Sequence, residues 1–263
     1  MPTCADRPAA RALLETTLNE VLCERHDGWA ELILNRPDRR NAIDGPLAKG
    51  MLTHLQALNA DASIRVIVLR GAGGALCSGL DLKAFSAEPA PPWLAGFNAR
   101  WGAVHQALLE CPKVLVVALE RYAINGGAAL ALAGDLLVCG AGAYLQVGEV
   151  QIGMAAPKNI AWLALRHGEA TAARLCLLGD RLDAQALMRE RIATEIVDDD
   201  QVVARACALA ERIAGFPPQG PSRIKTALRA ASLRMAPAEW FSACAAHDPQ
   251  AGQPVRPPRP AKS

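Results

Sequence analysis

The stretch from Tyr122 to Gly153, YAINGGAALALAGDLLVCGAGAYLQVGEVQIG, carries most of the information about the fold and the chemistry of this chain. It opens with a tight turn, Asn125-Gly126-Gly127, and continues into the short apolar segment Ala128 to Ala133. A turn of two glycines that opens an apolar helix leaves backbone N–H groups without intrahelical acceptors. Such N–H groups can stabilise a developing oxyanion. On its own, however, this turn is more often an ordinary strand-to-helix connection.

One carboxylate, Glu149, stands near the end of this stretch among small and apolar residues. A carboxylate in apolar surroundings has a raised pKa and is a candidate general base, although a lone glutamate is more often a solvated strand-end residue. A second glycine-rich turn, Gly71 to Lys83 (GAGGALCSGLDLK), also follows an apolar run of strand length. Two strand-end turns that each present an N–H, at Ser78 and Gly126, are what a two-donor oxyanion hole requires.

Length and composition restrict the class of protein. The chain has 263 residues, 51% of them hydrophobic, which suits one sizeable α/β domain or a core with a small appendage. A net charge of +2 without a basic, aromatic-rich stripe does not favour a nucleic-acid partner. The sequence contains no run of eighteen apolar residues, so no membrane span is expected. The first nineteen residues do not resemble a secretory signal.

Cysteine, histidine and glycine spacing exclude several kinds of site. The eight cysteines are scattered without a CxxC pair, which indicates free thiols in a reducing cytoplasm. The five histidines show no ligand spacing, so no metal site is expected. The phosphate-loop pattern and the dinucleotide fingerprint are both missing, which argues against a nucleotide cofactor.

The order of patterns along the chain predicts parallel β structure followed by helices. Apolar runs predict strands at residues 21–26, 30–34, 66–69, 114–119 and 196–197. Helical spacing predicts helices at residues 46–59, 93–110, 160–166, 171–178, 183–188, 201–214 and 221–231. The predicted organisation is a leader at 1–17, a core at 18–200, and a helical region at 201–263 that ends in a proline-rich tail from Asp248.

Several of these segments together resemble the enoyl-CoA hydratase/isomerase (crotonase) family, from about Val21 to Ala231. The matching segments are LNRPDRRNAID, CSGLDL (77–82), YAINGGAALALAGD (122–135), VGEVQIGM and LGDRLDAQAL (178–187). The resemblance implies an α/β fold, a spiral of β-β-α units, with a helical C-terminal region that builds a homotrimer, often paired into a homohexamer. It also implies an acyl-CoA thioester substrate, with no cofactor besides the CoA of that substrate, and a place in fatty acid metabolism.

The resemblance also assigns roles to particular residues. The backbone N–H groups of Ser78 and Gly126 would hold the thioester oxygen, and Glu149 would be the catalytic carboxylate. The loop at Ala42 and the backbone at Leu80 and Asp81 would contact CoA, although loop packing explains Ala42 and Leu80 equally well. Stabilising an enolate with two N–H donors and moving a proton with a nearby carboxylate is sound chemistry for a thioester.

The chain departs from the hydratases of this family at one position. Those enzymes use two glutamates, and the first of them corresponds here to Ala129, whereas the second corresponds to Glu149. A methyl group can neither orient nor protonate water. Δ3–Δ2-enoyl-CoA isomerisation needs only one carboxylate, which takes a proton from C2 and returns it to C4. The favoured hypothesis is therefore an isomerase with Glu149 as the proton shuttle.

The sequence is also compatible with other functions. A hydratase or decarboxylase of the same family could complete its site with Asn125, Tyr122 or His105, though a turn or packing role is commoner for each. A catalytically silent acyl-CoA binder is a further possibility. The tail keeps the family's RPP ending at residues 256–258 but lacks the segment that usually reaches CoA. Arg256, Arg259 or Lys225 could offer charge to the phosphates, but a solvated surface role is more usual. Phe97 and Trp101 are candidates for the acyl pocket or for ordinary core packing.

Overall fold

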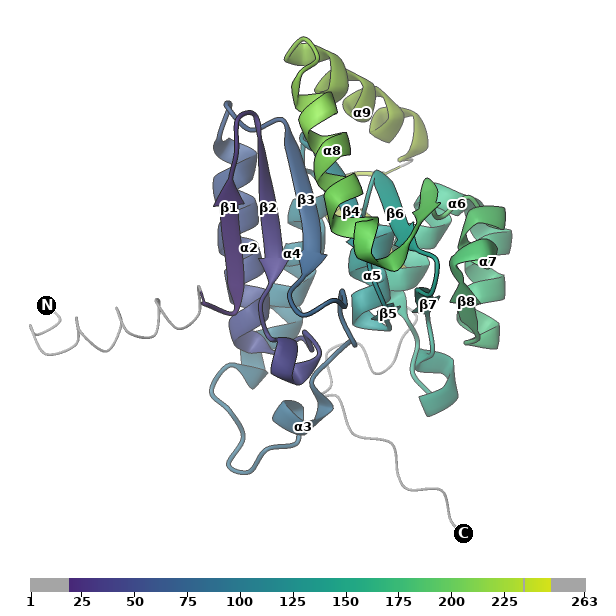
Figure 1. The fold of residues 1–263 in the computed structure, drawn as a ribbon. Coiled ribbons are helices and arrows are strands. Elements are labelled where there is room, and N and C mark those ends of the chain that lie inside the picture. The colour runs from purple at the N-terminus through teal and green to yellow at the C-terminus, as the bar shows by residue number, and fades with distance from the viewer. Residues whose placement is uncertain (1–18, 234, 247–263) are drawn as a thin grey trace, which may run out of the picture.

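A computed structural model describes residues 19–233 and 235–246 of the chain. The described part of the chain begins with an antiparallel hairpin. Its two strands are the first strands of a six-stranded sheet, which has the order β1-β2-β3-β4-β6-β9 (Figure 1). The β1–β2 pair is antiparallel, and every other neighbouring pair in this sheet is parallel. The strands of this sheet are β1 (Val21–Arg25), β2 (Trp29–Leu34), β3 (Val66–Gly71), β4 (Val114–Leu119), β6 (Leu136–Gly140) and β9 (Glu195–Val197).

A second, smaller sheet has the order β5-β7-β8 and stands beside the first. Its strands are only three residues long: β5 (Tyr122–Ile124), β7 (Tyr144–Gln146) and β8 (Arg181–Asp183). The α-helices are α2 (Gly45–Ala60), α3 (Leu82–Phe85), α4 (Phe97–Leu109), α5 (Gly126–Leu132), α6 (Pro157–Leu178), α7 (Ala184–Arg189), α8 (Val202–Ala214), α9 (Gln219–Ser232) and α10 (Pro237–Ala245). Short 3-10 turns are η1 (Pro37–Arg39), η2 (Leu94–Gly96), η3 (Glu149–Ile152) and η4 (Asp199–Gln201).

Both faces of the central strands of the large sheet are buried, and alternate residues along them belong to different cores. On β3, Ile67 and Leu69 join the core that includes α2 and α4, whereas Val66 and Val68 face α8. Figure 1 shows the same arrangement, with α2 and α4 behind the sheet and α8 in front. Continuous apolar runs such as VLVVAL in β4 are therefore required, because a parallel strand covered on both sides has no solvent face.

Most expected elements are present, with small differences at their ends. The strand at 114–119 is confirmed, and the expected helices at 46–59 and 201–214 correspond to α2 and α8. The two helices expected at 160–166 and 171–178 form one segment, α6, which is interrupted at Gly168 by a left-handed φ of 83°. The helix expected from Trp93 begins only at Phe97, after the 3-10 turn η2.

Some features were not expected from the sequence, and others lie outside the described residues. Strand β6, the three short strands of the small sheet and the helices α3 and α10 were not predicted. The leader at 1–17 and the tail from Asp248, including Arg256 and Arg259, lie outside the described residues. No helix in 19–233 or 235–246 has the length and apolar character needed to cross a membrane.

Candidate active site

The two glycine-rich turns lie side by side, because backbone hydrogen bonds join them. The N–H of Ile124 donates to the carbonyl of Cys77 at 3.0 Å, and the N–H of Cys77 donates to the carbonyl of Tyr122 at 3.2 Å. The approach is so close that a Cβ on Gly127 would lie 2.4 Å from the Cys77 oxygen. Glycine is needed at position 127 for this contact, which places the start of α5 against the segment that carries Ser78.

The two expected oxyanion donors differ in their hydrogen bonding. Gly126 is the first residue of α5, so its N–H has no intrahelical acceptor. The N–H of Ser78 donates to the carbonyl of Arg40 at 3.1 Å. Gly126 thus offers a donor that is free to bind a ligand oxygen, whereas Ser78 must share its proton with Arg40 or exchange that partner when a thioester binds.

Glu149 is held beside this turn by an amide that the sequence did not reveal as a site residue. Glu149 is the first residue of η3, and its Oε1 accepts a hydrogen bond from Nδ2 of Asn159 at 2.9 Å. The same Nδ2 donates to the carbonyl of Asn125 at 3.1 Å. The other carboxylate oxygen, Oε2, is buried and has no hydrogen-bond partner among the described residues. One oxygen is therefore fixed and the other is available to exchange a proton.

The surroundings of Glu149 make it a base suited to neutral pH. Burial raises the pKa of Glu149 to about 7, and the hydrogen bond from Asn159 opposes this rise. No charged side chain of the described residues is among the causes of the shift. The pKa of Glu149 is therefore shifted by burial and hydrogen bonding and not by a neighbouring carboxylate of the described residues.

Asn125 links the glycine turn at Gly126 to the residues that hold Glu149. Its backbone lies at φ 51° and ψ −115°, and its Oδ1 accepts the N–H of Gly148 at 2.8 Å. Its carbonyl oxygen accepts both from Asn159 and from the N–H of Ala129 at 3.1 Å. Ala129 is fully buried on the first turn of α5. The position that would supply a second hydratase carboxylate is therefore close to Glu149 but carries only a methyl group.

Apolar side chains lie next to the glycine turn at Gly126. A Cβ placed on Gly126 would lie 3.1 Å from Ile43 Cδ1, 3.8 Å from Leu80 Cδ2 and 3.9 Å from Trp101 Cζ2. Phe97 stacks on Trp101 with its ring centroid 6.3 Å away. These contacts put Trp101 of α4 beside Gly126, with Phe97 packed behind it, and the role of both in an acyl pocket stays a prediction.

The residues expected to contact CoA form one loop cluster beside these side chains. The N–H of Ala42 donates to Arg39 and its carbonyl accepts from the Arg36 guanidinium. The Asp81 carboxylate pairs with Arg39 at 3.0 Å and also caps α3. Leu80 is the member of this set that borders Gly126. The polar groups of Ala42 and Asp81 thus hold the loop together, and their contact with CoA stays a prediction.

Lys225 has neither of the roles considered for it from the sequence. It is not on a solvated surface, because only 5% of it is exposed. Its Nζ pairs with Asp135 at 2.7 Å and donates to the carbonyl of Lys113 at 2.6 Å. The amphipathic pattern of α9 did not reveal this buried ion pair, since a lysine in such a helix is usually solvated. Lys225 therefore anchors α9 to the sheet and is not available to CoA phosphates.

The three side chains considered as replacements for the missing glutamate are engaged elsewhere or packed. Asn125 uses its Oδ1 for Gly148, and Tyr122 lies beside the ring of Tyr144, 6.1 Å between centroids. His105 is fully buried, and its Nδ1 accepts from Nε1 of Trp162 at 2.9 Å. These contacts support turn and packing roles for Asn125 and Tyr122, and they give His105 a fixed orientation.

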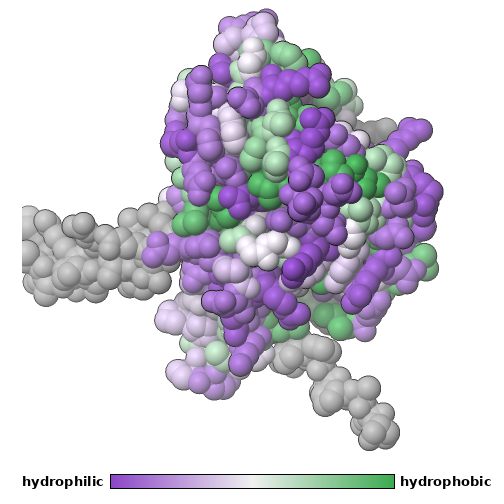
Figure 2. Space-filling view, in the orientation of Figure 1, coloured by the Kyte–Doolittle hydropathy of each residue, from purple (hydrophilic) through white to green (hydrophobic). Residues whose placement is uncertain are grey.

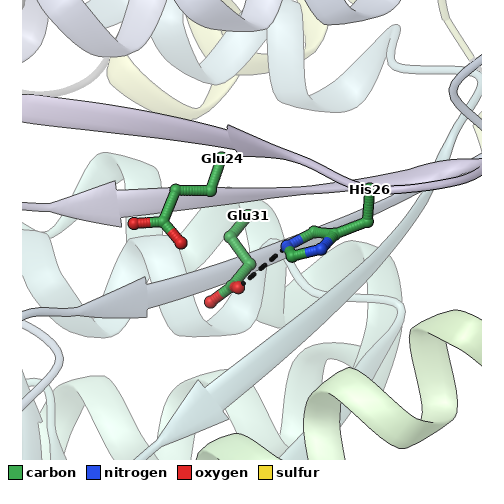
Figure 3. A group of neighbouring side chains, drawn as sticks. All are labelled: Glu24, His26 and Glu31. Carbon is green, nitrogen blue, oxygen red and sulfur yellow. Dashed lines mark hydrogen bonds and ion pairs between the residues drawn. The ribbon is translucent and has the colours of Figure 1, made fainter.

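Within the described ranges, one group of side chains has the composition of a metal site. Glu24, His26 and Glu31, at the β1–β2 hairpin, bring their ligand atoms within 4.8 Å of one another (Figure 3). The Glu31 carboxylate, however, already binds Nε of Arg70 and lies 3.1 Å from Nε2 of His26. Because a guanidinium neutralises the only buried carboxylate, the cluster is explained as an ion-pair network.

The hydrogen bond from Asn159 predicts a change in the pH dependence of activity. Replacing Asn159 with leucine removes the donor that stabilises the ionised form of Glu149, so the pKa of Glu149 rises further. A base must be deprotonated to work, and the rise of kcat with pH should therefore move from near 7 to higher pH. Rates measured between pH 5.5 and 9.5 on both proteins test this; an unchanged midpoint would contradict it.

Burial of Glu149 also predicts a pH-dependent effect on stability. Its pKa is higher in the folded chain, about 7, than the ordinary value of 4.5, so its stabilising contribution is complete below 4.5 and is lost as pH rises through 7. Glu149→Gln should consequently raise the free energy of unfolding by about 3 kcal/mol at pH 8 and leave it unchanged near pH 4. Urea unfolding at the two pH values measures the difference, and equal effects at both would contradict the prediction.

Comparison with known proteins assigns most of the chain to one family. Residues 24–244 match the family described as enoyl-CoA hydratase/isomerase. A carnitinyl-CoA dehydratase of Proteus mirabilis is 33% identical over 204 residues, 77% of each chain. A 1,2-epoxyphenylacetyl-CoA isomerase of Escherichia coli is 29% identical over 80% of this chain and 82% of its own.

Solved structures agree with the sequence comparison. An enoyl-CoA hydratase/isomerase of Mycobacterium paratuberculosis superposes with a TM-score of 0.79 at 26% identity, covering 89% of this chain and 94% of that one. The family match and the superposition thus indicate the same family and fold. The chain, with its crotonase fold, therefore belongs to the enoyl-CoA hydratase/isomerase family of acyl-CoA enzymes.

Proposed function

We propose that this enzyme isomerises a Δ3-enoyl-CoA to the conjugated Δ2-enoyl-CoA, with Glu149 as its single proton shuttle. The observation that carries the proposal is the buried Oε2 of Glu149, which has no partner among the described residues. Its companion Oε1 is fixed by Asn159, and Ala129 occupies the neighbouring position of the family's other carboxylate. A single poised carboxylate matches a reaction in which one proton leaves and one proton returns.

In the proposed reaction the thioester oxygen accepts the N–H of Gly126, with Ser78 as the second donor. Oε2 of Glu149 removes a proton from C2, and the C–H electron pair moves into the thioester to give a dienolate. The N–H donors stabilise the negative charge on its oxygen. Glu149 then returns the proton to C4 as the double bond forms between C2 and C3. No water, metal or redox partner takes part.

Hydration is the second candidate, because the family also contains hydratases; for example, a probable enoyl-CoA hydratase of Mycobacterium tuberculosis is 30% identical over 205 residues. Against it stands Ala129, since a buried methyl group cannot orient or protonate water. The contacts of Asn125, Tyr122 and His105 leave none of them in the place of that missing carboxylate. Isomerisation is therefore favoured over hydration, and over decarboxylation or silent acyl-CoA binding.

The test compares two substrates of one chain length, a trans-3-enoyl-CoA and a trans-2-enoyl-CoA. The absorbance of the conjugated thioester is followed in each reaction. The proposal expects absorbance to appear from the 3-enoyl substrate. Faster loss of absorbance from the 2-enoyl substrate would mean hydration, and no change in either would direct attention to malonyl-type thioesters and then to binding alone.

We also propose that the enzyme assembles as a homotrimer or homohexamer. On α9, Ile224 and Leu228 are 64% and 62% exposed, and Phe216 beside them is 45% exposed. Figure 2 shows apolar residues at the surface near the top of the molecule, where α9 lies. These side chains border a groove of about 530 Å³. Exposed apolar surface of this kind is typical of an interface, and the mass in solution by light scattering tests the proposal.

A further inference from the structure

A row of aromatic side chains leads from the Gly126 turn to His105, whose Nε2 has no hydrogen-bond partner among the described residues. Trp101 borders Gly126, and His105 follows one helical turn later on α4, with its ring edge-on to Trp101 at 4.5 Å. One turn and a fraction of α-helix corresponds to about 6 Å along the helix axis. Beyond Trp101, the His105 ring contacts Trp162 of α6 and Phe241 of α10, which also contact each other. Ring-to-ring contacts therefore connect the Gly126 turn to His105.

His105 presents a hydrogen-bond donor that is not used within the described part of the chain. Nε1 of Trp162 donates to Nδ1 of His105, so Nδ1 is an acceptor and the proton of the neutral ring is on Nε2. Burial, helped by the charge of Lys158, lowers the pKa of His105 well below its ordinary value and keeps the ring neutral. Nε2 is buried and has no partner. A buried donor without an acceptor is costly, so a group that accepts from Nε2 would be stabilised there.

Lys158 brings a positive charge to the same place. It lies on the same face of α6 as Trp162, because residues four apart are neighbours on a helix surface. Its Nζ lies 4.7 Å from the centroid of Phe241, the ring that His105 also contacts. No acidic partner of Lys158 is found in residues 19–233 or 235–246. A partly buried ammonium and a buried N–H donor therefore adjoin one ring.

We propose that the acyl group processed by this enzyme ends in a carboxylate, which His105 Nε2 and Lys158 Nζ bind. A carboxylate can accept from both donors and neutralises the ammonium. A hydroxyl or ketone oxygen would leave the cation unpaired, and a methyl end would leave both donors unpaired. The proposal rests on the proposed function only in placing the thioester at Gly126. It narrows the substrate class to CoA thioesters of dicarboxylic acids a few carbons long.

The first test measures binding and needs no turnover. Two saturated acyl-CoA ligands of equal chain length, one with a methyl end and one with a carboxylate end, are titrated into the full-length protein by calorimetry. The carboxylate-ended ligand should bind at least tenfold more tightly, because a charge-assisted hydrogen bond contributes that much. Equal affinity, or no binding of either ligand, would overturn the proposal. A preference without any isomerisation of enoyl-CoA would leave this proposal standing and overturn only the proposed function.

Variants assign the preference to the two side chains. Lys158→Met, which keeps the length of the side chain, should weaken binding of the carboxylate-ended ligand by about 10- to 100-fold and leave the methyl-ended ligand unchanged. Lys49→Met on α2 is the matched control, because Lys49 is also partly buried and belongs to a different helix. His105→Gln, which can still accept from Trp162 and donate, should keep most of the preference, whereas His105→Phe should lose it. Equal losses for both ligands would show a packing role and contradict the proposal.

Discussion

Glu149→Gln is expected to lower kcat for isomerisation of a 3-enoyl-CoA by about 10³-fold or more, with little change in the affinity for acyl-CoA. General acid–base catalysis contributes roughly 10² to 10⁴ in rate. The loss should fall in the upper part of that range, because Glu149 acts in both proton transfers. Glutamine is similar in shape, and its Oε1 can still accept from Asn159, so the site stays intact while its base is removed.

The measurement is the initial rate of absorbance increase at saturating substrate. Glu169→Gln provides the matched control, because Glu169 is exposed on α6 and its loss removes the same charge away from the site. The control should keep the rate of the original enzyme. If Glu149→Gln kept it too, the proton would be moved by another group, and the account of the site would be wrong.

Removing the N–H of Gly126 is expected to cost about 10² to 10³ in kcat, the usual effect of deleting one oxyanion donor. Gly126→Pro deletes this N–H at the first position of α5, where helices tolerate proline. Gly126→Ala is the matched control, since it adds a similar Cβ beside Ile43 but keeps the donor. Both variants should bind acyl-CoA, and only the proline variant should lose the greater part of kcat.

The comparison requires that both variants fold. Proline also restricts the residue before it, and Asn125 has a positive φ of 51°. Melting temperatures of the two variants are therefore measured first, and Asn125→Gly combined with each substitution supplies a second pair in which that strain is relieved. Equal kcat in the alanine and proline members of either folded pair would contradict the assignment of Gly126 as an oxyanion donor.

Most strands of the large sheet were predicted from the sequence, but β6 and the small sheet were not. Strands β3 and β4 are buried on both faces, so their sequences are continuous apolar runs, and such runs predict strands. Strands β5, β7 and β8 have three residues each, which is too short for any periodicity to appear. The Gly168 interruption of α6 was visible as a break between two helical patterns, because glycine readily adopts the left-handed φ found there.

The candidate site shows the same division between side-chain patterns and spatial contacts. Glu149 and the two glycine turns could be identified because their residue types carry the chemistry. Asn159, which holds Glu149, gave no signal, since an asparagine near the start of a helix is commonplace. Likewise, the buried pairing of Lys225 with Asp135 joins residues 90 positions apart in sequence and depends on how α9 packs against the sheet.

The proposed reaction depends on one sheltered carboxylate, Glu149, which moves a proton from C2 to C4. A 3-enoyl-CoA carrying two deuterium atoms at C2 tests this directly, with the product analysed by mass spectrometry at early times in ordinary water. Because Oε2 of Glu149 is buried, part of the product should carry one deuterium at C4 and one at C2. Product with only solvent hydrogen at C4, at every time and temperature, would contradict the single-carboxylate mechanism.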